Sequence, residues 1–154
     1  MAPISKLIFF TMHRFVGINS HQQKLLVEAS LYLLAARLMV SLMPFRNLSR
    51  ILDKKLEGMA VGETDGVAVV DDISWAVNRA ARHLPVRLVC FPQGIAAFLM
   101  LRRRRIDSRL YYGISNVPGK NFVGHVWVMY GKKSVTGCEQ AHEYTVMMSY
   151  PSEQ

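Results

Sequence analysis

The sequence predicts an α+β fold in which N-terminal helices precede a small antiparallel sheet. Apolar residues favour helices over most of residues 20–104, apart from the glycine-containing segment 58–72. After Ile106 the pattern changes to short β-branched and aromatic segments separated by turn residues. With 154 residues, 51% of them hydrophobic and 19% charged, the chain can build a core and is not of the disordered class. We therefore expect a single domain over 1–154, with an N-terminal helical part at 1–57 and a core at 74–154 that carries the chemistry.

Two helices are expected in the N-terminal part. The first covers residues 3–16, with Pro3 tolerated in its first turn. The second begins at Ser20 as N-cap, because Gln23 three residues later completes a capping box, and Pro44 ends it. This second helix is apolar on nearly every face, which is typical of a helix central to its domain.

Three segments are predicted between Pro44 and Cys90. Residues 46–57 are predicted to form a short amphipathic continuation, and residues 58–72, with three glycines, a loop and the most mobile segment. A helix capped by Asp72 or Ser74 follows and ends at Pro85.

The last helix and the sheet follow in order. Pro92 suits the first turn of a helix that runs from Gln93 to about Arg104, directly after Cys90. A turn is expected at 116–120 and a tight turn at Gly131. The expected strands are residues 108–114, 121–130, 134–136 and 144–148.

Composition limits the environment and the partners. The formal charge of +8 and the pI of about 9.8 favour anionic partners, without choosing among nucleic acid, a membrane surface and an acidic peptide. The apolar fraction suits a docking surface or a poorly soluble free subunit. Two cysteines make no disulfide framework, so we expect free thiols in the reducing cytoplasm.

No targeting or membrane-spanning segment is convincing. The N-terminus lacks the long apolar stretch and the cleavage site of a secretory signal. The apolar stretch at 25–45 is interrupted by Glu28 and Arg37, so a buried helix is the preferred interpretation and a membrane-associated helix the alternative.

Cys90 is the candidate nucleophile. It precedes a helix, where unpaired N–H groups and the helix dipole favour a thiolate. The same N–H groups, that of Phe91 among them, and the Gln93 side chain are candidates for contacts to the oxyanion or the substrate. A buried structural cysteine, and for Gln93 a simple role at the helix start, are the alternatives.

His125 is the candidate base. Alternation in VGHVWVMY places it on one strand face with Trp127. A histidine there is often part of the core, but a strand histidine facing a cysteine at a helix start is the arrangement that Cys–His hydrolases use.

Taken together, these residues resemble a known family. The segments VRLVCFPQGIAAFLMLRRRRIDSRLYYGI and GHVWVMYGKKSVTGCEQAHEYTVM are similar to the transglutaminase-like leader peptidases of lasso-peptide biosynthesis. The upstream segments EASLYLLAARLMVSLMPFRNLSR and SWAVNRAARHLP resemble the same family, so the resemblance covers nearly the whole chain. It implies a papain/transglutaminase-like core with Cys90 on the helix and His125 on the sheet.

The resemblance also implies an activity and partners. Such cysteine peptidases remove the leader from a ribosomally made precursor peptide, which a separate small recognition protein presents, and an ATP-dependent cyclase then closes the ring. The short segment before residue 20 suggests the stand-alone form. The acyl-transfer chemistry needs no metal or organic cofactor.

Two positions depart from the family pattern. An Asp that usually follows the His by about a dozen residues is missing, since no Asp comes after Asp107. Gly137 stands near its place, and Glu139, then Glu143, are the nearest carboxylates, so Glu139 is the candidate third residue. Arg105 stands where many relatives have a Gly, which predicts a changed turn.

Other functions stay open at this point. Cys138 and His142 with Cys90 and His125 would make a Cys₂His₂ zinc set, although no close-spaced ligand pair exists around Cys90. The four arginines ending at Arg105 could contact phosphates, but they also suit a solvated helix end without nucleic acid. The missing Asp favours a third possibility, a non-catalytic peptide-binding module, which would contain an unreactive Cys90.

Overall fold

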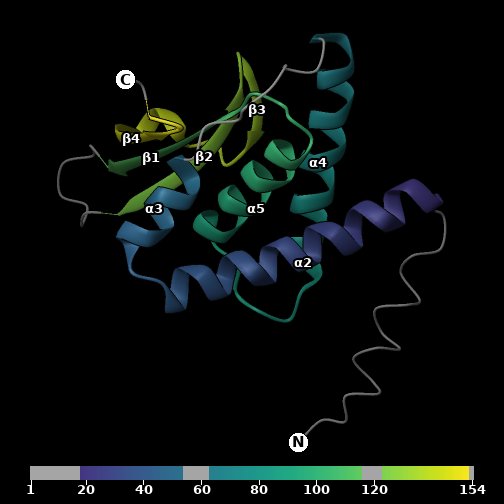
Figure 1. The fold of residues 1–154 in the computed structure, drawn as a ribbon, viewed down its shortest axis with the longest axis horizontal. Helices are drawn as coiled ribbons and strands as arrows, with labels where there is room; N and C mark the ends of the chain where they lie inside the picture. The colour runs from purple at the N-terminus through teal and green to yellow at the C-terminus, as the bar shows by residue number, and fades with distance from the viewer. Residues whose placement is uncertain (1–17, 54–62, 116–122, 153–154) are drawn as a thin grey trace, which may run out of the picture.

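The computed structural model describes residues 18–53, 63–115 and 123–152. The expected helix at 3–16 and the turn at 116–120 lie outside these residues. The described part is α+β, as predicted, with four helices followed by a four-stranded antiparallel sheet (Figure 1). The helix α5 lies between α2 and the sheet and contacts both, so the elements pack around it.

Helix α2 (Ser20–Leu42) ends before Pro44 as predicted, but its N-cap is Asn19 and not Ser20. The Asn19 side chain accepts from the Gln22 backbone N–H at 2.8 Å, and the Gln22 side chain accepts from the Asn19 N–H at 3.3 Å. The capping box thus lies one residue earlier, because Asn caps a helix as well as Ser does. Helix α3 (Phe45–Asp53) follows, and the rest of the predicted 46–57 segment lies outside the described residues.

The prediction of a loop at 58–72, with a helix cap at Asp72 or Ser74, is wrong for the described part. Helix α4 runs Glu63–His83, and the end before Pro85 is as predicted. Val70 and Ile73 are fully buried in the core, so tertiary packing stabilises a helix that glycine content argues against. Residues 58–62 lie outside the described part.

Helix α5 (Cys90–Arg103) is the buried centre of the fold. It ends in a Schellman motif, since Ile106 N–H donates to the Leu101 carbonyl at 3.1 Å and Arg105 N–H to that of Arg102 at 2.9 Å. Arg105 takes the left-handed conformation with φ 57°, which a glycine adopts more readily.

The strands are close to the predicted ones. They are β1 (Arg109–Ser115), β2 (Gly124–Tyr130), β3 (Lys133–Thr136) and β4 (Tyr144–Tyr150). Their order in the sheet is β3-β2-β1-β4, with every pair antiparallel. This order leaves β2 beside β3 and β1, with α5 packed against it.

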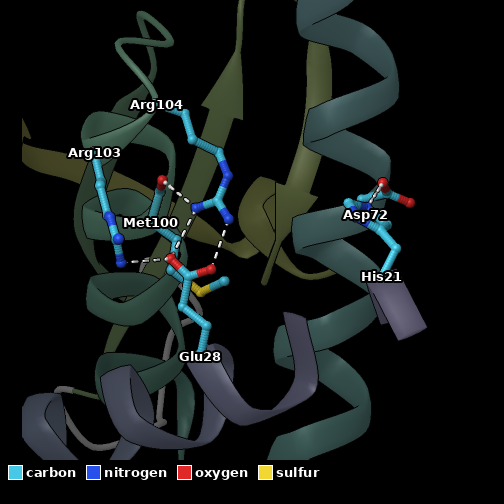
Figure 2. A network of polar contacts seen from close by, with 6 residues as sticks. All are labelled: His21, Glu28, Asp72, Met100, Arg103 and Arg104. Carbon is cyan, nitrogen blue, oxygen red and sulfur yellow. Dashed lines mark hydrogen bonds and ion pairs between the residues drawn. The ribbon is translucent and has the colours of Figure 1, made fainter. Parts of the chain in front are cut away.

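The arginine run at the end of α5 has structural partners. Arg104 forms a two-pronged pair with Glu28 of α2 at 2.6 and 2.9 Å, and Arg103 reaches the same carboxylate at 3.3 Å (Figure 2). The hydrogen bond from Arg104 holds the pKa of Glu28 below its ordinary value, and the same bond raises the pKa of Arg104. Arg102 donates to the backbone carbonyls of Ile51 and Leu52 at the end of α3. The run therefore ties α5 to α2 and α3.

The outer face of α2 is apolar and exposed. Its inner face packs on α4 and α5 through buried leucines and alanines. A stripe on the other side, spaced at three and four residues, comprises Val27, Leu31, Leu34, Leu38 and Leu42. By length and composition α2 could cross a membrane, a test that the core helices of soluble proteins also pass.

Candidate active site

Four elements enclose a cavity of about 320 Å³ on the sheet side of α5. Helices α4 and α5 contribute one wall, and β2, β3 and the segment after β3 contribute the other. The cavity is lined by Ser74, Asn78, Cys90, Gln93, His125, Val135, Thr136, Gly137, Cys138 and Glu139. The predicted nucleophile, Cys90, and the predicted base, His125, are thus both lining residues of one cavity.

Cys90 is the first residue of α5 and is partly exposed to this cavity. The first N–H groups of a helix have no acceptor inside it, and the N-cap residue Val89 offers no side-chain acceptor. Pro92 has no N–H, so those of Cys90 and Phe91 are the ones available at this helix end. The sulfur therefore lies at the positive end of the helix dipole.

His125 lies on β2 and is only 9% exposed. Its Nε2 is 2.6 Å from the carbonyl oxygen of Gly137. Two aromatic rings lie nearly parallel to the imidazole, Tyr144 with ring centroids 4.8 Å apart and Trp127 at 5.9 Å. The ring thus has fixed neighbours on several sides.

A close approach of backbone to side chain joins the strand of His125 to the helix of Cys90. A Cβ built on Gly94 would lie 2.4 Å from Cγ1 of Val126, the residue after His125. Glycine at 94 therefore lets α5 approach β2 more closely than any other residue would allow. This contact limits how closely α5, which carries Cys90, can approach β2, which carries His125.

Of the other predicted site residues, Gln93 and Glu139 line the cavity and Phe91 does not. Gln93 lines the cavity, but its side-chain amide donates to the Leu88 carbonyl at 2.7 Å and so also secures the segment before α5. Phe91 is not among the lining residues; its ring packs edge-on against Tyr112. Glu139 lines the cavity and is exposed, and within the described residues it makes no hydrogen bond or ion pair. Its assignment as the third residue stays a prediction.

Sequence reasoning did not identify the wall that α4 contributes. Ser74 and Asn78 lie one helical turn apart on that helix, and Ser74 Oγ donates to the Val135 carbonyl of β3 at 2.5 Å. The spacing of these two polar residues was the available signal. A helix that starts at residue 72 or 74 makes Ser74 a cap, whereas α4 starts at Glu63 and places Ser74 in its interior.

The four residues of the zinc hypothesis do not come together around this cavity. Cys138 lines it, with its thiol 3.2 Å from the Val128 carbonyl, whereas His142 is not among the lining residues. In the described ranges, no group of three or more His, Cys, Asp or Glu side chains could hold a metal ion. The donor set that the sequence suggested is therefore not assembled.

A thiol at a helix start and an imidazole in one cavity are the parts that acyl transfer on sulfur requires. A family model described as the transglutaminase-like superfamily matches residues 30–149, a range that includes Cys90, His125 and all but the last residue of the sheet. Searches of curated proteins and of solved structures gave no match. The match covers well over half of this chain, so the chain belongs to the transglutaminase-like superfamily. Members of that superfamily are typically cysteine peptidases or transglutaminases.

Proposed function

We propose that this protein is a cysteine peptidase that removes the leader from a ribosomally made lasso-peptide precursor. The observation that carries the proposal is that Cys90, at the start of α5, and His125, on β2, line the same cavity. Membership of the transglutaminase-like superfamily supports acyl transfer on the cysteine.

The reaction proceeds in two halves. His125 takes the proton from the Cys90 thiol while the sulfur attacks the scissile carbonyl carbon. The tetrahedral oxyanion faces the backbone N–H groups of Cys90 and Phe91, which stabilise its negative charge. The imidazolium returns the proton to the leaving amine, and the C–N bond breaks to give a thioester on Cys90. His125 then deprotonates a water that cleaves the thioester, which releases the carboxylate and restores the thiol.

The resemblance of the CFPQ and GHVWV segments to lasso-peptide leader peptidases supports the choice of substrate. On this proposal the protein works in the cytoplasm, where a small recognition protein presents the leader and an ATP-dependent cyclase takes the product. The net charge of +8 suits an acidic leader or an acidic surface on the partner.

The direct test is leader cleavage followed by mass spectrometry. The assay contains the precursor encoded beside this gene and its recognition protein, with wild type, Cys90→Ala, His125→Ala and Glu139→Ala compared. The matched control His83→Ala removes an exposed histidine at the end of α4, outside the cavity. We expect cleavage to disappear in the first two variants and to persist in the control, and Glu139→Ala tests the predicted third residue. Equal cleavage by Cys90→Ala would refute the mechanism.

A second measurement separates an enzyme from a peptide-binding module on the same fold. Treatment with iodoacetamide at neutral pH, followed by peptide mapping, reports which thiol reacts. We expect the adduct on Cys90 and little on Cys138, whose thiol contacts the Val128 carbonyl at 3.2 Å. An inert Cys90, together with no cleavage by wild type in the presence of its partner, would favour the binding module.

A further inference from the structure

We propose that the backbone carbonyl of Gly137 is the positioning group for His125, in place of a carboxylate. The inference rests on the proposed function in one respect, namely that His125 acts as the base toward Cys90. The structural part of the inference, which concerns the tautomer and orientation of the imidazole, does not depend on any activity.

The tautomer follows from the chemistry of the contact. Nε2 of His125 and the Gly137 oxygen are 2.6 Å apart, a hydrogen-bond distance. A carbonyl oxygen only accepts, so Nε2 must carry the proton. In the neutral ring the lone pair is then on Nδ1, which has no hydrogen-bond partner among the described residues. Nδ1 is thereby the nitrogen left to receive the Cys90 proton.

The surroundings hold the ring in that orientation. His125 is 9% exposed, and the Tyr144 and Trp127 rings lie at 29° and 21° to its plane. A 180° rotation of the ring about χ2 would put Cε1 where Nε2 now lies, lose the bond to Gly137 and leave its carbonyl without this donor. The neighbouring rings and the carbonyl together therefore specify one tautomer in one rotamer.

Glycine is required at 137 for the carbonyl to lie where it does. Its φ is +72°, in the left-handed region. A Cβ at this position would lie 2.5 Å from the Val126 carbonyl oxygen and 3.4 Å from the Trp127 Cα. Any side chain would push the segment after β3 away from β2 and remove the acceptor from Nε2. An aspartate at this position would not fit the observed backbone.

The neighbouring carboxylate does not take this role in the structure. Glu139 is exposed, and it makes no hydrogen bond to the imidazole within the described residues. A neutral carbonyl still fixes the tautomer, although a hydrogen bond to an ionised acceptor is roughly twice as strong. The chain thus retains control of the tautomer without the carboxylate that the family resemblance implies.

The test reads the tautomer directly in the full-length protein without substrate. Long-range ¹⁵N–¹H correlation spectra of ¹⁵N-histidine-labelled protein are recorded at pH about 8.5, where an ordinary histidine is neutral. The His125 signals are assigned by their loss in His125→Gln. We expect the proton on Nε2, unchanged in Glu139→Gln. A proton on Nδ1, or a tautomer that changes in Glu139→Gln, would overturn the inference.

A pair of glycine variants tests the carbonyl itself. Gly137→Ala is expected to change the single Nε2–H tautomer into the mixture of two tautomers that an unconstrained imidazole shows, and to reduce leader cleavage at least tenfold. The matched control is Gly131→Ala, because Gly131 also has a positive φ of 54° but a Cβ there meets nothing within 4 Å. It should retain the tautomer, and cleavage to within about threefold, because left-handed strain at 131 lowers stability without displacing the Gly137 carbonyl.

The possible failures are distinguishable. Gly137→Ala that keeps a full Nε2–H preference would show that the carbonyl does not select the tautomer. If that variant does not fold, the wild-type and Glu139→Gln spectra still show whether Nε2 carries the proton and whether Glu139 affects the tautomer. Absence of cleavage by wild type would refute the proposed function, whereas the tautomer would still be read from the same protein.

Discussion

The contact between Gly94 and Val126 predicts a substitution whose effect on stability changes sign with its background. In the wild type, Gly94→Ala places a Cβ 2.4 Å from Val126 Cγ1, whereas carbons in contact prefer about 3.5–4.0 Å. Helix α5 and β2 must then separate by about 1 Å. Such overpacking costs about 1–3 kcal/mol, while alanine in a helix gains about 0.5–1 kcal/mol over glycine. We expect net destabilisation by up to about 2.5 kcal/mol.

Removing the opposing methyl group should reverse the sign. Val126→Ala alone leaves a cavity and costs about 2 kcal/mol. In that background the nearest atoms to the new Cβ are Val126 Cβ at 3.5 Å and Leu110 Cδ1 at 3.9 Å, both ordinary contacts. Gly94→Ala should then be neutral or stabilising by up to about 1 kcal/mol, from helix propensity alone. Urea denaturation of the four proteins measures the coupling free energy.

The same variants connect packing to activity. A separation of about 1 Å between the Cys90 helix and the His125 strand is expected to reduce kcat/KM for leader cleavage by about 10²-fold. The double variant should recover at least tenfold of that loss. Strict additivity of the two free-energy changes, or Gly94→Ala that stabilises the wild type, would refute the argument that this contact sets the distance between the two elements.

Three further substitutions test the helical frame. The hydrogen bond from Arg104 lowers the pKa of Glu28 in the folded protein, so its contribution to stability should be complete above the ordinary carboxyl pKa of 4.5 and be lost as pH falls through the folded pKa. The free energy of unfolding of wild type should exceed that of Glu28→Gln by about 1 kcal/mol at pH 7, and the difference should close in acid. A difference independent of pH would contradict the pairing with Arg104. Arg105→Gly should raise the free energy of unfolding by about 0.5–1 kcal/mol, because φ is 57° there, and an unchanged urea midpoint would refute the strain. Ser74→Ala removes the donor to the Val135 carbonyl and should cost about 1 kcal/mol in the same assay; no loss would show that this bond contributes nothing to the α4–β3 contact.

The local patterns in the sequence were sufficient for much of the fold. Pro44 and Pro85 stop helices because proline lacks the N–H that a helix interior needs, and this holds in any tertiary context. The alternating apolar residues around His125 predict a strand because side chains alternate between the faces of a sheet. Cys90 at a helix start was visible from Pro92 and the apolar run after it.

The start of α4 was not visible in the same way. Glycines at 58, 62 and 66 argued for a loop, and local propensity was outweighed by the burial of Val70 and Ile73 against the rest of the core. The candidate site was affected as well, because a helix that starts at residue 72 or 74 does not indicate that Ser74 and Asn78 line the cavity.

The sequence also determined only part of the chemistry of the site, and the tertiary structure supplied the rest. The sequence determined Cys90 and His125 as candidates, because a thiol at a predicted helix start and an imidazole on a predicted strand suit acyl transfer and lie in segments that resemble the family. The family resemblance implied a carboxylate for the third role, with Glu139 as the nearest candidate. Only the tertiary structure presents a carbonyl, that of Gly137, 2.6 Å from Nε2. Every residue carries a backbone carbonyl, so no pattern of side chains reveals which one the fold will turn toward a histidine.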